Sequence, residues 1–120
     1  MQDKATRVKV SEVPGPNGTP ITALRFSGDI TSMSKDAVLG TYQSLPLNAK
    51  RILLDFSNVE YLNSSGIALV IQMLMQAGKA GQSIQTFGLS PHFQKVFTMV
   101  GITNYTRLHA DEAAACAAFD

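Results

Sequence analysis

Apolar and polar residues alternate at the start of the chain and later change to a helical spacing. Val8 and Val10 are separated by charged or polar neighbours, which is typical of a half-buried strand. Residues 14–20 are dense in proline and glycine and predict a hairpin turn. A second alternating stretch over residues 21–27 then predicts the partner strand of that hairpin.

Helical spacing begins after residue 30, where a cluster of hydroxyl side chains offers helix N-caps, and Pro46 ends this first helix. The run over residues 51–56 is short and almost continuously apolar, as in a central strand that is covered on both faces. We expect residues 57–63 to form a loop in which Tyr61 and its apolar neighbours pack inward. A second helix is predicted from Ser64 to about residue 77.

The rest of the chain continues to alternate between strand and helix. Four elements are predicted: a strand over residues 83–87, a helix that starts at Ser90-Pro91 and closes at Gly101, a strand over 106–108, and a helix over 111–118. The order β-β-α-β-α-β-α-β-α predicts an α/β fold over residues 1–120. We expect one domain with a mixed sheet of four to five strands, parallel after the hairpin, and about four helices.

Composition and charge narrow the functional classes. The 120 residues are 45% hydrophobic and 16% charged, as in a globular domain, and their net charge is only +1. This balance lacks the basic surface that nucleic acid requires. The longest apolar stretch, residues 67–75, contains Gln72 and is far shorter than the roughly 20 residues of a membrane span. We therefore expect a soluble, cytoplasmic protein without nucleic-acid or membrane partners.

Residues that catalyse reactions or bind metals are scarce. Cys116 is the only cysteine, and His92 and His109 lack a metal-ligand spacing, so we expect a small apolar side chain and two surface or helix-end histidines. Nucleotide-binding glycine motifs are missing from the sequence. Asp55 ends a strand and could serve a metal or a reaction, but an acceptor that anchors the following loop is the simpler interpretation. We expect no enzyme, no metal and no cofactor.

The segment around the second predicted helix is the most informative. Ser64 and Ser65 stand at its start, directly after a buried strand and loop, where a helix presents unpaired N–H groups and the positive end of its dipole. A structural role alone would explain them, with Asn63 or Ser64 as the N-cap and Gly66 permitting a tight entry. The remainder of this helix favours a binding role as well.

Helical geometry predicts a core face that includes Val70 and Leu74 and an opposite face that points to solvent. The predicted solvent face carries Ser65, Ala68, Leu69, Gln72, Gln76 and Lys79, with Met73 and Met75 on its flanks. An exposed leucine and methionine beside a capping hydroxyl indicate a docking surface. We expect Leu69, Gln72, Met73 and Gln76 to contact a partner.

The stretch from Asp55 to Gly66 is similar to the signature of STAS domains, and specifically of bacterial anti-sigma factor antagonists. Their pattern is roughly Asp-Leu-Ser-x-Val-x-x-x-Asp-Ser-Ser/Thr-Gly, followed by an apolar helix. The segments Gly28-Asp29-Ile30 and Leu89-Ser90-Pro91 resemble further parts of the family, so the similarity covers nearly the whole chain.

The resemblance implies a mechanism of partner switching. Such proteins bind an anti-sigma factor that is also a serine kinase, and thereby free a sigma factor. The kinase phosphorylates the first serine of the motif, which corresponds to Ser64, with Ser65 as the alternative acceptor, and a metal-dependent serine phosphatase removes the phosphate. Asp29 is expected to contribute to the partner surface.

Two positions depart from the family pattern. Asn63 stands where an acidic residue is usual, and Thr31 stands where an aspartate is frequent. Asn63 keeps the capacity to cap the helix but lacks the negative charge, so recognition by a kinase or phosphatase is expected to differ. The alternative interpretation is a STAS scaffold, or a partner-switching subunit of a signalling complex that does not act on a sigma factor.

Overall fold

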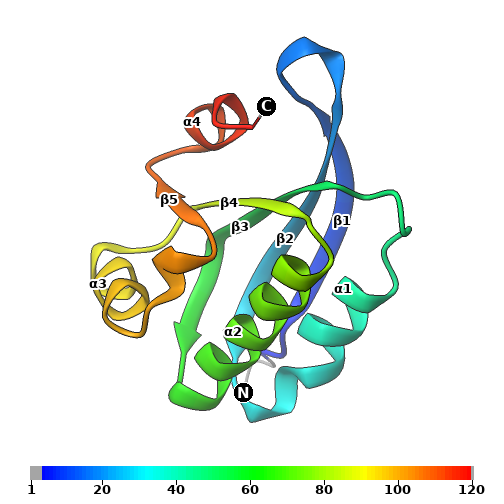
Figure 1. Cartoon of the computed structure of the whole chain (residues 1–120). Coiled ribbons are helices and arrows are strands. Elements are labelled where there is room, and N and C mark those ends of the chain that lie inside the picture. Colours follow the sequence, from blue (N-terminus) through cyan, green and yellow to red (C-terminus); the bar gives the residue numbers. More distant parts are fainter. Residues whose placement is uncertain (1–3, 120) are drawn as a thin grey trace.

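The computed structural model describes residues 4–119, which form one five-stranded sheet with helices on both of its faces (Figure 1). The strands are β1 (Arg7–Pro14), β2 (Pro20–Ile30), β3 (Arg51–Leu62), β4 (Ser83–Phe87) and β5 (Arg107–His109). The α-helices are α1 (Thr41–Gln43), α2 (Ser64–Lys79), α3 (Pro91–Met99) and α4 (Glu112–Ala117). Short 3₁₀ turns occupy Pro16–Gly18, Ser32–Ser34 and Ile102–Asn104. The predicted order of elements is confirmed.

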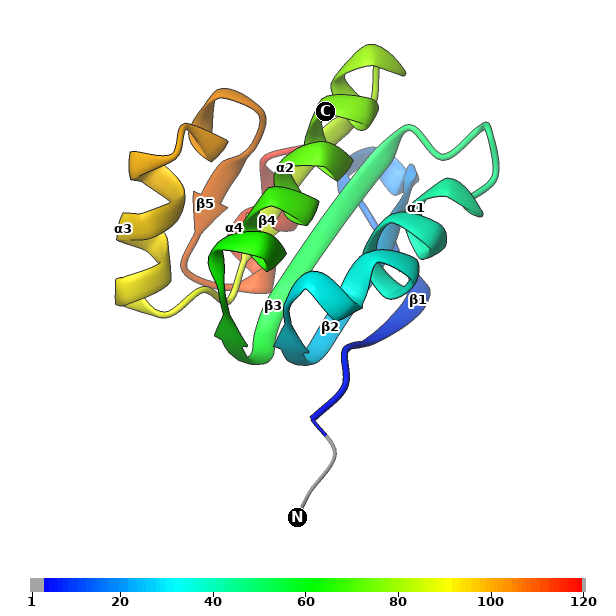
Figure 2. The ribbon, with the colours of Figure 1, turned by 90° about the horizontal axis from the view of Figure 1, so that it is seen from below.

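The strands lie in the sheet in the order of the sequence, β1-β2-β3-β4-β5. β1 and β2 are antiparallel and the other neighbours are parallel, so the sheet is mixed as predicted. Helices α1 and α2 cover one face, and α4 lies on the other (Figures 1 and 2). The larger apolar core fills the first face and includes Phe97 of α3, whereas a smaller cluster beneath α4 contains Ala115 and Phe119.

The first predicted helix is divided into three segments. Thr31 caps the 3₁₀ turn Ser32–Ser34, and the hydroxyl of Ser34 accepts a hydrogen bond from the N–H of Thr31 at 2.8 Å. A π-helical turn, Asp36–Gly40, follows and continues into α1. The apolar spacing still directs its side chains to the core, where Val38 is fully buried. None of the helices within residues 4–119 has the length and apolar character needed to cross a bilayer.

The two central strands are longer than predicted. β2 continues to Ile30 and β3 continues to Leu62, so the prediction of a loop over residues 57–63 is wrong. Beyond Asp55 the strands still pair, but with two register shifts, and such irregularities interrupt the alternation by which a strand is recognised in sequence. Tyr61 was expected to pack inward, yet it is 51% exposed, because successive side chains of a strand point to opposite faces and its neighbour Leu62 is the one that is buried.

Candidate functional site

The start of α2 is held by a cap and by its neighbour strand. Asn63 has an extended backbone, and its side-chain oxygen accepts a hydrogen bond from the N–H of Gly66 at 2.8 Å. The N–H of Asn63 in turn donates to the carbonyl oxygen of Ile30 at 3.3 Å. Of the two caps that the sequence allows, the structure therefore has Asn63, and Ser64 becomes the first residue of the helix.

Gly66 is required by the close approach of α2 to β2. A Cβ atom placed on Gly66 would lie 2.0 Å from the carbonyl oxygen of Ile30, a separation that side chains do not adopt. The first turn of α2 thus rests directly on the end of β2. This contact fixes the position of the two preceding serines, which follow the carboxyl end of β3.

Ser64 and Ser65 are both exposed at the amino end of a 16-residue helix. The first turn of a helix offers no internal acceptor for its leading N–H groups, and the helix dipole places roughly +0.5 charge there. The first turn of α2 contains no acidic residue, so nothing on it neutralises this charge. A phosphate group on either hydroxyl would therefore meet unpaired N–H groups and a favourable potential.

The orientation of α2 differs from the prediction. Leu69 is 8% exposed and Met73 is 1% exposed, so both pack in the core and the expectation that they contact a partner is wrong. The helix lies over the centre of the sheet with the Asp36–Gly40 segment on its flank, and is covered over a wide arc. Apolar side chains of α2 point in most directions around its axis, and their spacing in the sequence did not show which of them face the sheet.

The solvent side of α2 carries a small surface, which we term the exposed face of α2. It consists of Ser64, Ser65, Ala68, Gln72, Met75 and, in the last turn, Lys79, which is its one charged residue. Gln76, a predicted partner contact, is half-buried, and its side chain accepts a hydrogen bond from Gln43 at 3.2 Å.

Two apolar side chains beside the start of α2 were not predicted from the sequence as part of the site. Met33 is 91% exposed in the 3₁₀ turn that packs beside α2, and Tyr61 stands three residues before Ser64. A single methionine in a turn carries no periodic signal, so sequence reasoning could not identify it. Met33, in the turn that packs against α2, thus adds exposed apolar surface that another protein could cover.

Asp29, predicted to contact a partner, lies near the end of β2 and is half-buried. Its N–H donates to the carbonyl oxygen of Lys4 at 2.8 Å, and its own carbonyl oxygen accepts from the hydroxyl of Thr6 at 2.6 Å. These bonds tie the chain before β1 to the region that packs against α2. Whether the Asp29 carboxylate meets a partner stays a prediction.

The buried carboxylate of Asp55 lies on the opposite face of the sheet, in a cluster with Arg25 and Glu112. Arg25 donates to Asp55 at 2.9 Å and to Glu112 of α4 at 2.7 Å. These two hydrogen bonds raise the pKa of Arg25, and the bond to Glu112 has the larger effect. Asp55 also accepts from the N–H of Ser57 at 2.9 Å, so it is the hydrogen-bond acceptor that was expected, but the segment it holds is the continuation of β3 and not a loop. The cluster joins α4 to the sheet.

His109 and Cys116 are two further titratable side chains whose surroundings shift their pKa values. His109 is half-buried with its ring 2.7 Å from the amide oxygen of Gln85, and desolvation lowers its pKa. Burial raises the pKa of the Cys116 thiol, which disfavours the reactive thiolate. Within residues 4–119, no cluster of three histidine, cysteine or acidic side chains could hold a metal ion.

Comparisons with known proteins identify the fold. A family model described as "Mlab, STAS domain" matches residues 19–109. An anti-sigma factor antagonist from Mycobacterium paratuberculosis has a TM-score of 0.71 at 17% identity, over 95% of this chain and 93% of its own. Bacillus SpoIIAA in its phosphorylated form has a TM-score of 0.65 at 17% identity, over 89% and 95%.

A protein from Shewanella loihica with a SpoIIAA-like fold has a TM-score of 0.66 at 14% identity, over 96% of this chain and 95% of its own. At such identities the likeness concerns the fold alone, and it confirms the predicted α/β architecture. No curated protein sequence is significantly similar to the chain.

Proposed function

Because the chain belongs to the STAS domain family, we propose that it binds an anti-sigma factor that is also a serine kinase, and that phosphorylation of Ser64 ends this binding. The chain acts as a single domain without catalytic activity of its own, and its binding releases a sigma factor. A metal-dependent serine phosphatase restores the active form. The observation that carries the proposal is the pair of exposed hydroxyls at the amino end of α2, on a face whose first three turns carry no charged residue.

The chemistry of the helix start supports a phosphorylation switch. A phosphate adds about −1.5 to −2 charge units and three acceptor oxygens. The N–H groups of the first turn can donate hydrogen bonds to it while the helix stays folded, because the Asn63 side chain takes up only the N–H of Gly66. Bacillus SpoIIAA, which is similar in fold, has been solved in phosphorylated and unphosphorylated forms, which supports the view that this architecture tolerates the modification.

The same charge explains the loss of binding. The exposed face of α2 carries no charged residue before Lys79 in its last turn, so a partner that covers the start of this face brings Ser64 into a desolvated contact. A phosphate brings about −1.5 to −2 charge units against roughly +0.5 at the helix start, so most of its charge is uncompensated in that contact, which costs a few kcal/mol. Phosphorylation therefore switches the surface and leaves the fold intact.

The proposal is tested by mapping phosphate transfer. The purified chain is incubated with each anti-sigma factor kinase encoded in the same genome and with ATP, and the phosphate is located by mass spectrometry. We expect one phosphate on Ser64, lost in Ser64→Ala and retained in Ser65→Ala. Phosphate on neither serine with any of these kinases would contradict the kinase part of the proposal.

A second candidate function has the same surface but a different partner. The matching family model is described as Mlab STAS, and Asn63 lacks the negative charge that anti-sigma factor antagonists carry before the serine. Both observations favour a STAS subunit of another complex, which binds through the exposed face of α2 without acting on a sigma factor. The Asn63→Asp variant separates the two candidates. If it gains phosphate transfer that the natural chain lacks, the second candidate is favoured.

A further inference from the structure

We propose that the groove between α3 and β5 binds an extended acidic segment of another protein, which joins the sheet as an additional strand beside β5. β5 is the last strand of the sheet that residues 4–119 form, so one of its edges pairs with β4 while none of these residues forms a strand beside the other. The outward backbone groups of such an edge are able to pair with a new strand. Helix α3 flanks this edge in two perpendicular views (Figures 1 and 2).

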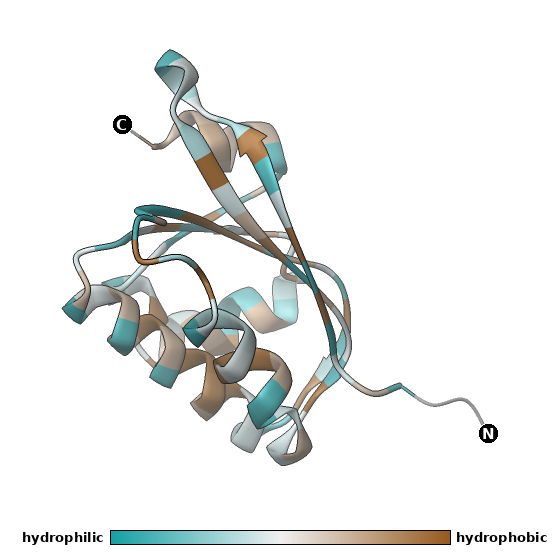
Figure 3. Cartoon of the chain, turned by 90° about the vertical axis from the view of Figure 1, so that its right-hand side faces the viewer, coloured by the Kyte–Doolittle hydropathy of each residue, from teal (hydrophilic) through white to brown (hydrophobic). Residues whose placement is uncertain are grey.

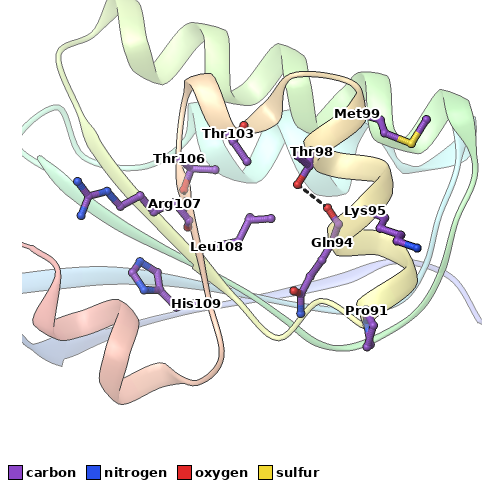
Figure 4. Close-up of a pocket in the computed structure, with 10 residues that line it drawn as sticks. All are labelled: Pro91, Gln94, Lys95, Thr98, Met99, Thr103, Thr106, Arg107, Leu108 and His109. Atoms are coloured by element: carbon purple, nitrogen blue, oxygen red, sulfur yellow. Dashed lines mark hydrogen bonds between the residues drawn. The ribbon is translucent and has the colours of Figure 1, made fainter.

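A helix beside a free strand edge is the arrangement by which several domains bind peptides through strand addition. The groove here has a volume of about 890 Å³. Leu108 points from β5 toward α3, and Met99 lies farther along α3 (Figure 4). Met99 is 84% exposed, so an apolar side chain entering the groove would cover surface that is now in contact with water.

The charges around the groove select an acidic occupant. Lys95 and Arg107 line it, and none of the described residues that line it is acidic. The sequence strengthens this asymmetry, because no aspartate or glutamate occurs between Glu60 and Asp111. A segment with carboxylates therefore meets cations at the groove and little repulsion from the elements that form it, which favours its association over that of a basic segment.

The pleat of β5 also specifies the order of side chains in the ligand. Arg107 and His109 extend to the side of the sheet where His109 contacts Gln85, whereas Leu108 faces the core side near α3 (Figure 4). Side chains of an added strand alternate in the same way. An acidic residue in the ligand then lies beside Arg107, and the residues before and after it lie against Leu108 and α3. The expected ligand alternates acidic and apolar residues.

This site is separate from the exposed face of α2, since the two share no residue, and the inference does not depend on the identity of the α2 partner. It is tested with a fluorescein-labelled heptapeptide of alternating glutamate and valine, titrated into the whole protein at low salt and neutral pH. Two matched peptides serve as controls, one with lysine in place of glutamate and one with N-methyl groups on alternate residues, which removes the N–H donors of one strand edge. We expect saturable binding of the first peptide only.

Three variants locate the binding. Arg107→Glu reverses the charge beside which the acidic residue of the ligand lies, and it is expected to raise the dissociation constant at least about fivefold. Lys95→Glu reverses a charge on α3, against which the apolar residues of the ligand lie, and it is expected to raise the dissociation constant by less. Lys79→Glu makes the same change at the end of α2, outside the groove, and is expected to leave the dissociation constant unchanged. Backbone amide resonances of residues 107–109 should show the largest shifts in NMR spectra.

Several results would overturn the inference. The first is the lack of saturable binding below about 1 mM, a Kd that corresponds to a binding free energy of about 4 kcal/mol. The second is equal binding of the N-methylated peptide. The third is a set of resonance shifts confined to α2. Tighter binding of a poly-thymidine oligonucleotide to the same groove would assign it to nucleic acid instead.

Discussion

Replacing Gly66 with alanine would place a methyl group where the first turn of α2 rests on β2. The added Cβ would lie 2.0 Å from the carbonyl oxygen of Ile30 and 2.6 Å from its carbonyl carbon. Both atoms belong to the backbone of a paired strand, so neither can rotate away. The close-packed interior leaves one means of relief, a movement of the start of α2 by about 1 Å.

The cost follows from two opposing terms. Overpacking of a well-packed core costs about 1–3 kcal/mol, and a clash with backbone belongs at the upper end of that range. Alanine recovers up to about 1 kcal/mol over glycine through its helix propensity. We expect Gly66→Ala to lower the free energy of unfolding by about 2 kcal/mol, which lowers the urea midpoint by roughly 1 M for a domain of this size.

Gly78→Ala is the matched control in the same helix. A Cβ atom at Gly78 has no other atom within 4 Å, so the propensity term acts alone and should stabilise the protein by about 0.5–1 kcal/mol. Urea unfolding followed by circular dichroism measures both variants. Midpoints that shift in the same direction by the same amount would refute the contact between α2 and β2, and with it the placement of the two serines.

Two further predictions test the packing of the domain. Leu69→Ala should lower the free energy of unfolding by about 2–4 kcal/mol, because the side chain is buried. Met75→Ala on the exposed face of α2 should change it by no more than about 0.5 kcal/mol. Urea unfolding measures both variants, and equal losses of stability would contradict the observed orientation of α2. Desolvation lowers the pKa of His109, so protonation is less favourable in the folded state than in the unfolded state, and stability should be complete above about pH 6.5 and decline as the pH falls below it. The decline between pH 7.5 and 5.5 (about one pH unit on either side of the ordinary histidine pKa of the unfolded state) should be smaller in His109→Gln, and identical declines in the two proteins would contradict the assignment to His109.

Features with local causes could be predicted from the sequence. Ser90 followed by Pro91 marks the start of α3 because a capping hydroxyl and a fixed backbone angle act within one turn, and the structure has that start. The strand over residues 83–87 was predicted with its observed bounds, since a short segment between Gly81 and Gly88 has few alternative structures. The capped, serine-bearing start of α2 depends on the same kind of local signal.

Features that depend on neighbours could not be predicted in this way. Leu69 and Met75 are both apolar residues of one helix, and only the positions of the sheet and the Asp36–Gly40 segment determine that the first is buried and the second exposed. The extension of β3 beyond Asp55 likewise depends on its pairing with β2 across two register shifts. Met33 joins the site through packing between separate elements, which no spacing along the chain reveals.

The central claim is that a negative charge on Ser64 prevents a partner from binding while the fold persists. Isothermal titration compares the natural chain, Ser64→Asp and the uncharged Ser64→Asn, each with the kinase that transfers phosphate to the chain. We expect Ser64→Asp to raise the dissociation constant at least about tenfold, or about 1.4 kcal/mol, with Ser64→Asn close to the natural chain and all three melting at nearly the same temperature. Undiminished affinity in Ser64→Asp would contradict the account.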